Sequence, residues 1–174
     1  CKVAATFGAK GVIVHGGSVG EGGDIGQGYE NWGKAIKEVE DIGVKVLVEN
    51  TAGGKNSVAR YMDSIERLWE VIGHLNVGLC LDTCHTWAGG IPTIEAVKGF
   101  KKLVKKIDLI HFNDSKDGFE SSRDRHENLG KGQIPKEELE YVIKNAKTDI
   151  IVETPNGPDA QKKDIAWIKR RLKK

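Results

Sequence analysis

Five short apolar runs each end in an acidic residue or a histidine, and this pattern limits the fold more than any other feature. The terminal residues are His15, Glu49, Asp82, His111 and Glu153. They follow one another at intervals of roughly 30 to 40 residues, and a strand with its return helix takes roughly 30 residues or more. Each should therefore lie at the carboxyl end of its own strand. Because these ends converge on one face of a parallel barrel, we expect five ligand-type side chains to meet there.

The remaining sequence predicts a regular alternation of strands and helices. The expected strands are 12–14, 46–48, 77–81, 107–112 and 150–152, and the expected helices are 32–42, 58–72, 94–106, 136–146 and a final basic helix from Asp159. The glycine-rich segment 16–28 predicts a loop. The polar segment 113–133 predicts a second loop of a length that usually carries function.

The composition predicts one folded domain over residues 1–174. A hydrophobic content of 39% and a charged content of 30% are typical of globular chains. A closed barrel of eight βα units takes about 250 residues, whereas five strands can be placed here. The segment before Val12 has the pattern of a helix that ends at a glycine near Gly8 or Gly11. We therefore expect an α/β fold, a TIM-type (β/α)₈ barrel that is incomplete here, with about the last five βα units.

Charge and cysteine content exclude some function classes. A formal net charge of +2 does not by itself indicate a nucleic-acid partner. No apolar stretch approaches the roughly 20 residues of a membrane-spanning helix. Three cysteines, Cys1, Cys80 and Cys84, do not make an even disulfide framework, which favours a reducing compartment, and we expect a cytoplasmic location. Cys80 and Cys84 are candidate zinc ligands, but small buried hydrophobic residues are the favoured interpretation.

Further ligand-type residues lie close to the strand ends. Asp82 and His85 are three residues apart in LDTCHTW, and Asp124 and His126 flank Arg125 in RDRH. Mixed carboxylate and imidazole ligands suit zinc, manganese or iron rather than calcium. A carboxylate at the end of a buried strand is unfavourable unless it is paired or metal-bound. Salt bridges to lysines are the alternative for any one residue, but the repetition on five strands favours a metal site.

Several longer motifs together resemble the successive signatures of a known family. They are ENTAGG (49–54), CLDTCHTWAGG (80–90), HFNDSKD (111–117), SRDRHENLGKGQI (122–134) and IVETP (151–155). In order and in spacing they are similar to the motifs of the endonuclease IV family, the zinc-dependent apurinic/apyrimidinic endonucleases of base-excision repair. HGGS (15–18) resembles an earlier histidine motif of that family. The resemblance covers essentially the whole chain.

The resemblance implies a (β/α)₈ barrel that holds three zinc ions. One zinc would take His85, Asp124 and His126; a second would take Asp82, His111 and Glu153 and share Glu49; the remaining zinc would take His15 and Glu49. In the family this last zinc also takes a histidine from a strand that would precede residue 1. The sequence has no position for that histidine, so we expect an N-terminally truncated chain.

The implied reaction is hydrolysis of the phosphodiester on the 5′ side of an abasic site in double-stranded DNA. A hydroxide bridging two zinc ions attacks phosphorus, and the third zinc neutralises the leaving 3′ oxygen. Glu49 is the implied bridging ligand, and Glu153 is the candidate to orient or deprotonate the nucleophile. Asn113 is expected to donate to a phosphate or to anchor a ligand. Arg125 is expected to face DNA, with a salt bridge to Asp124 or Glu127 as the alternative.

Two other functions remain open from the sequence. A sugar isomerase or epimerase of the xylose-isomerase-like superfamily holds a single metal with a set like Glu49, Asp82, His111 and Glu153, and it does not need His85, Asp124 or His126. An inactive barrel fragment would bind zinc without cleaving DNA. The number of metals per chain separates these cases. A repair nuclease should hold nearly three, a sugar isomerase one, and an inactive fragment two or fewer. Family members act as monomers, but the unpaired sheet edges of a fragment predict self-association.

Overall fold

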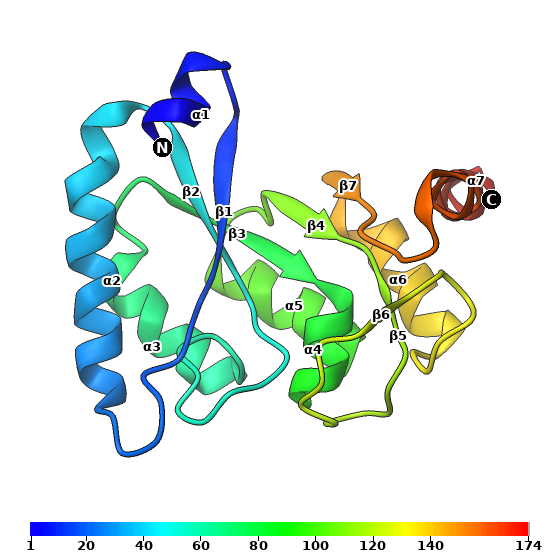
Figure 1. Ribbon diagram of the computed structural model, residues 1–174, viewed down its shortest axis with the longest axis horizontal. Helices are drawn as coiled ribbons and strands as arrows, with labels where there is room; N and C mark the ends of the chain where they lie inside the picture. Colours follow the sequence, from blue (N-terminus) through cyan, green and yellow to red (C-terminus); the bar gives the residue numbers. More distant parts are fainter. Residues whose placement is uncertain (174) are drawn as a thin grey trace.

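Five parallel strands form the main sheet of the computed structural model, which describes residues 1–173. The strands are β1 (Gly11–His15), β2 (Lys45–Glu49), β3 (Val77–Asp82), β4 (Leu109–His111) and β7 (Asp149–Ile151). Their order is β1-β2-β3-β4-β7, so neighbours in this sheet are also successive along the chain (Figure 1). All neighbouring pairs are parallel. The five predicted strands are confirmed.

Helices connect successive strands and pack against one another. They are α1 (Lys2–Thr6), α2 (Ile25–Val39) with the short 3₁₀ turn η1 (Glu40–Ile42), α3 (Met62–Ile72), α4 (Thr83–Gly89), α5 (Thr93–Leu103), α6 (Lys136–Ala146) and α7 (Gly157–Leu172). Helix α2 contacts α3, α3 contacts α5, α5 contacts α6, and α6 contacts α7. None of the described helices combines the length and the apolar character needed to cross a membrane.

Side chains of β3 point alternately toward the apolar core and toward the opposite face of the sheet, where the candidate ligand residues lie. Leu79 and Leu81 belong to the core, which also contains Phe100 of α5. Successive residues of a strand point to opposite faces, so Cys80 and Asp82 lie on the face away from this core. Asp82 is fully buried. The fold therefore places a carboxylate at the strand end, inside the protein and on the face away from the apolar core.

Helix α2 begins earlier than the sequence predicts. The glycine content of residues 16–28 predicts a loop, but the helix begins at Ile25. The Asp24 side chain caps it by accepting from the Gly26 amide at 2.8 Å. A Cβ at Gly28 would lie 2.8 Å from a Val19 methyl group. This glycine thus permits close packing rather than ending the helix.

Helix α3 starts later than predicted, and one short helix was not predicted at all. Helix α3 begins at Met62 rather than near residue 58, because Val58 and Ala59 are buried in the core from an irregular segment. Helix α4 was not predicted. It begins directly after β3, where Asp82 caps it by accepting from the His85 amide at 2.8 Å. The three-residue spacing of this pair is therefore also a helix-capping signal.

The long loop after β4 is held in shape by the buried carboxylate of Asp114. It contains a short antiparallel pair, β5 (Asp114–Ser115) and β6 (His126–Glu127). The Asp114 carboxylate accepts from the amides of Ser115, Gly130, Gly132 and Ile134 at 2.8 to 3.1 Å. Burial raises the pKa of Asp114, although these amides oppose the shift. One side chain thereby fixes both ends of the loop.

We predict that Gly132→Ala destabilises this loop. A Cβ at residue 132 would lie 2.3 Å from the Ser115 carbonyl oxygen and 2.4 Å from Asp114 Oδ1. The clash should lower the free energy of unfolding by about 1–3 kcal/mol, the range typical of a disrupted buried network. Gly118→Ala in the same loop is the control, because nothing lies within 4 Å of its Cβ position. Equal urea midpoints for the two variants would contradict the prediction.

Candidate metal centre

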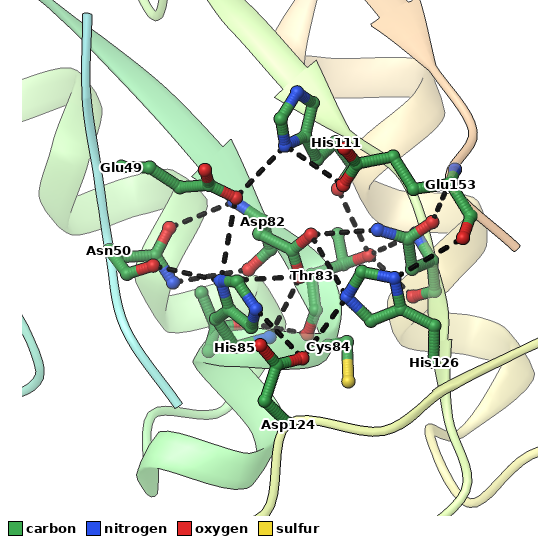
Figure 2. A network of polar contacts seen from close by, with 12 residues as sticks. Glu49, Asn50, Asp82, Thr83, Cys84, His85, His111, Asp124, His126 and Glu153 are labelled. Carbon is green, nitrogen blue, oxygen red and sulfur yellow. Dashed lines mark hydrogen bonds and ion pairs between the residues drawn. The ribbon is translucent and has the colours of Figure 1, made fainter. Parts of the chain in front are cut away.

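The carboxyl ends of the parallel strands bring all eight predicted ligand residues together. The strand ends supply His15, Glu49, Asp82, His111 and Glu153, and the segments after β3 and β4 supply His85, Asp124 and His126. The sheet register sets His15 beside Glu49 and Asp82 beside His111. In Figure 2 the labelled carboxylates and imidazoles turn toward a common centre. The convergence expected from the spacing is thus present in the structure.

One group contains four possible ligands. Glu49, Asp82, His111 and Glu153 each offer one atom, and these atoms all lie within 4.8 Å of one another. His111 Nδ1 lies 2.9 Å from Glu49 Oε1 and 3.1 Å from Glu153 Oε2. Asp82 and Glu49 are buried, whereas the Glu153 side chain is 42% exposed. The group thus combines buried carboxylates with one carboxylate that is accessible to solvent.

A second group surrounds Asp124. Its Oδ1 lies 3.0 Å from His85 Nε2 and 3.3 Å from His126 Nε2. His126 Nε2 is also 3.7 Å from Asp82 Oδ2, so the second group adjoins the first. The Asp124 side chain is 51% exposed. Each group therefore has one carboxylate that is accessible to solvent.

Glu49, a member of the four-ligand group, also contacts His15. Its Oε1 faces His111, and its Oε2 lies 3.4 Å from His15 Nε2. His85 Nδ1 is 3.4 Å from Glu49 Oε1, so His15, Glu49 and His85 also lie close together. The His15 side chain is 58% exposed, whereas that of Glu49 is 4% exposed. Glu49 is positioned to serve two cation sites with its two oxygens.

Two buried nitrogen atoms support the fit of a metal to this donor set. Within residues 1–173, Nε2 of His85 and Nε2 of His126 are buried and make no hydrogen bond. The Asp124 oxygen is close to both, but neither contact has hydrogen-bond geometry. Buried polar atoms normally have a partner. A cation shared with Asp124 would satisfy both atoms, and imidazole with carboxylate is a donor set that suits zinc.

Backbone carbonyl groups fix which nitrogen of each histidine is available. His85 Nδ1 lies 2.9 Å from the Asn50 carbonyl oxygen, and His126 Nδ1 lies 3.4 Å from the Glu153 carbonyl oxygen. A carbonyl only accepts, so each Nδ1 is the donor, and in the neutral ring each Nε2 carries the lone pair. The available nitrogen of His85 is thus the one that lies 3.0 Å from Asp124 Oδ1. Hydrogen bonds of this kind are typical of metal-binding histidines.

The carboxylates change the pKa of the histidines. Burial disfavours the imidazolium of His85, but Asp82 and Asp124 outweigh this effect and raise the pKa of His85 to about 9. Glu49 likewise outweighs burial and raises the pKa of His111. The close imidazole of His126, followed by that of His85, holds the pKa of Asp124 well below its usual range. Without metal, protons on the imidazoles balance the buried negative charge.

Cys80 and Cys84 are buried, as the sequence analysis favoured. Both are fully inaccessible, and Cys84 lies near Asp124 and His126. Burial, followed by the neighbouring carboxylates, raises the pKa of the Cys84 thiol to about 12. The same causes raise the pKa of Cys80. Zinc binds the thiolate rather than the thiol. Their burial fits the favoured interpretation as small buried side chains beside the centre.

Asn113 does not face the surface, which corrects the prediction of a phosphate contact. Its side chain is fully buried. Its Nδ2 donates to Asp82 Oδ2 at 2.7 Å, and its Oδ1 accepts from the Glu153 amide at 2.8 Å. The alternative prediction, that Asn113 anchors a ligand, describes these contacts. Both polar atoms of the side chain have partners inside the protein, and its burial keeps it from the surface where DNA would bind.

Arg125 pairs with a residue that the sequence analysis did not consider. Its Nε donates to Asp117 Oδ2 at 2.6 Å, and its Nη2 also contacts that carboxylate. The predicted alternatives, Asp124 and Glu127, are not its partners in the described ion pairs. The Arg125 side chain is 48% exposed. It lies on the same loop as the ligands Asp124 and His126 and can reach solvent.

Sequence reasoning missed Asn50 as a member of the centre. Its side-chain oxygen accepts from the Asp82 amide at 2.8 Å, and its Nδ2 donates to the Asp82 carbonyl at 3.1 Å. The available signal was its place directly after Glu49, at the end of a buried strand, where a polar side chain needs partners. Those partners come from another strand, so their identity was not readable from local sequence.

Comparisons with known proteins give the family. The model of the xylose isomerase-like TIM barrel family matches residues 1–171. A probable endonuclease 4 of Mycobacterium tuberculosis is 47% identical over 171 residues, which are 98% of this chain and 67% of that protein. The chain belongs to the endonuclease IV family. A relative of the same name from Mycobacterium marinum is 45% identical over 172 residues, with 99% and 67% covered. The resemblance noted in the sequence is confirmed.

Solved structures of this endonuclease IV family and of its neighbours share the fold. Endonuclease IV from Thermus thermophilus superposes with a TM-score of 0.77 at 30% identity, covering 99% of this chain and 65% of that one. A D-tagatose 3-epimerase-like protein gives a TM-score of 0.74 at 19% identity, covering 98% and 64%, and shows the fold alone. The chain thus spans about two thirds of the length of its relatives. The predicted TIM-type fold, represented here by five βα units, is confirmed.

We predict that zinc binding to the metal-free protein releases protons. The pKa of His85 is raised to about 9, so this imidazole is protonated at pH 7, and a metal must displace that proton. The ion pairing of His85 stabilises the metal-free fold below its ordinary pKa of 6.5, and this stabilisation is lost as pH rises through about 9. Zinc affinity should rise over the same interval.

Calorimetric titration in buffers of different ionisation enthalpy measures the proton release. The apparent binding enthalpy at pH 7 should depend on the buffer, and the dependence should weaken toward pH 9. An apparent enthalpy that is the same in all buffers at pH 7 would contradict the prediction.

Proposed function

We propose that this chain carries the catalytic centre of a DNA-repair endonuclease that hydrolyses the phosphodiester 5′ of an abasic site, with zinc as cofactor. The observation that carries the proposal is the Asp124 group, His85–Asp124–His126, beside the four-ligand group. A single-metal sugar isomerase needs only the latter. Membership in the endonuclease IV family supports the same conclusion.

The donor atoms support three assignments of ligands. Glu49, Asp82, His111 and Glu153 would hold one zinc, and His85, Asp124 and His126 would hold another. His15 would hold a further zinc together with Glu49. Bound zinc supplies Lewis-acid chemistry, because it acidifies water and offsets negative charge on a phosphodiester.

The protein side chains position the reactants. Glu49 has both oxygens committed, one toward His111 and one toward His15, so it fixes the spacing between neighbouring sites. Glu153 is half-exposed, and its amide is held by Asn113. It is placed to orient or deprotonate an incoming water while it stays at the centre. Glu49 and Glu153 are accordingly the proposed catalytic residues.

The open side of the centre provides room for DNA. A cavity of about 310 Å³ is lined by residues that include His15, Ser18, Thr51, His85 and Asp124. Arg125 is on the loop that bounds this side, where its guanidinium can exchange the Asp117 carboxylate for a phosphate. The proposed substrate is double-stranded DNA with an abasic site. Arg125 is the proposed DNA contact, and Asn113 supports the ligands from behind.

Incision of a duplex that contains one abasic site tests the proposal. Cleavage should occur on the 5′ side, disappear with a chelator and return with zinc. Glu49→Gln should reduce the rate by about 100-fold or more, the scale for loss of a preorganised charged group. The control is Glu70→Gln, the same change at an exposed position on α3, which supplies no ligand. It should incise at the unchanged rate.

Two outcomes would contradict the nuclease proposal. Binding of one zinc per chain, with metal-dependent epimerisation of a ketose and no incision, would favour the sugar isomerase. Zinc binding without either reaction would favour an inactive barrel fragment. Because zinc content is measured on the same preparation, a failure of chemistry is distinguished from a failure to bind metal.

A further inference from the structure

The side chain of Asn50 takes the place of the backbone at the end of the ladder between β2 and β3. The last backbone pair in the register is Glu49 with Cys80. Beyond it, Asn50 Oδ1 accepts from the Asp82 amide at 2.8 Å, and Asn50 Nδ2 donates to the Asp82 carbonyl at 3.1 Å. A primary amide carries one acceptor and two donors, so it makes the two bonds that a strand residue would make. Asn50 is 1% exposed.

Because the side chain makes these two hydrogen bonds, the Asn50 backbone is free of the sheet. Its carbonyl oxygen lies 2.9 Å from His85 Nδ1 instead of pairing with β3. The carbonyl holds a proton on Nδ1, so Nε2, which lies 3.0 Å from Asp124 Oδ1, is the nitrogen left to bind a metal when the ring is neutral. His85 Nε2 is buried and has no hydrogen-bond partner in the described chain. The side-chain amide of Asn50 thus ends the pairing of the two strands, and its backbone carbonyl fixes the orientation and the tautomer of the His85 imidazole.

We infer that Asn50 is a positioning residue that selects the metal-binding tautomer of His85 by ending the β2–β3 ladder with its side chain. The inference rests on the proposed function, because it requires that His85 ligates zinc through Nε2. Asp82 couples the two effects, since its Oδ1 accepts from the His85 amide at 2.8 Å. A shift of the Asp82 backbone would therefore also move His85.

The four-ligand group has its own support, which makes the effect of Asn50 selective. Asn113 holds the Asp82 carboxylate at 2.7 Å and the Glu153 amide at 2.8 Å. Thr83 Oγ1 accepts from the Asn113 amide at 2.9 Å and donates to its carbonyl at 2.6 Å. None of these contacts involves Asn50. Removal of the Asn50 amide should weaken the Asp124 group more than the four-ligand group.

Metal content of the Asn50→Ala variant of the full chain tests the inference. Zinc per chain is measured by elemental analysis after dialysis against a series of chelator concentrations. The variant should lose one zinc at chelator concentrations about 10- to 100-fold lower than the unaltered chain, the range for loss of a hydrogen-bonding partner of a metal ligand. The remaining zinc should be retained at unchanged concentrations.

Ser64→Ala is the matched control for a general loss of stability. Ser64 is a buried polar residue at the start of α3, where it exchanges hydrogen bonds with the Tyr61 backbone at 2.8 and 3.1 Å. It contacts no ligand. This variant should keep the metal content of the unaltered chain. If both variants lose zinc in parallel, reduced stability explains the loss and the inference is wrong.

A measurement on the unaltered chain keeps the inference testable if Asn50→Ala does not fold. Long-range ¹H–¹⁵N correlation spectra of the zinc-loaded protein, with His85 assigned by the His85→Asn variant, report which ring nitrogen carries the proton. We expect the proton on Nδ1 and zinc on Nε2. The reverse arrangement would overturn the inference whatever the variant does.

The outcomes separate this inference from the proposed function. If the unaltered chain binds no zinc, the proposed function fails. The inference then fails with it, because His85 would not ligate a metal. If the unaltered chain binds zinc at the Asp124 group and Asn50→Ala binds it equally well, the proposed function stands and the inference fails. Selective loss of one zinc, together with the expected tautomer, supports both.

Discussion

The rest of the site depends on buried negative charge at the strand ends. Glu49 and Asp82 are almost completely inaccessible, and among the described residues the four ligand carboxylates form ion pairs with histidines and not with lysine or arginine. An uncompensated buried carboxylate is strongly unfavourable. The compensation must come from protons on the imidazoles or from cations, and these alternatives exclude each other at the same nitrogen. Proton and metal therefore compete for one centre.

The sheet and the loop after β4 contribute to this centre in different ways. Parallel register fixes the strand-end ligands without any special sequence beyond the alternation of βα units. Asp124 and His126 come from an irregular loop, so buried polar contacts must hold them. Asp114 gathers four loop amides, and Asp164 of α7 accepts from Asn128 and Leu129 just beyond His126. The loop is thus fixed from two sides.

The sequence predicted the five strands and the convergence of ligand types because both follow from periodicity and spacing. It did not predict the role of Asn50, and it left Asn113 open between a phosphate contact and the anchoring of a ligand, because the partners of both side chains lie about 30 residues or more away in the chain and depend on which backbone groups the sheet leaves free. Helix α4 was missed because Asp82 and His85 were interpreted only as a pair of metal ligands. In the structure Asp82 is also the N-cap of the helix, and His85 lies in its first turn. The start of α2 was missed because Gly28 permits close packing with Val19.

Anomalous diffraction at the zinc edge, from crystals of the zinc-loaded chain, tests the central claim most directly. The account predicts separate peaks, one among Glu49, Asp82, His111 and Glu153 and another among His85, Asp124 and His126. A single peak at the first position, with Asp124 and His126 turned away from His85, would contradict it.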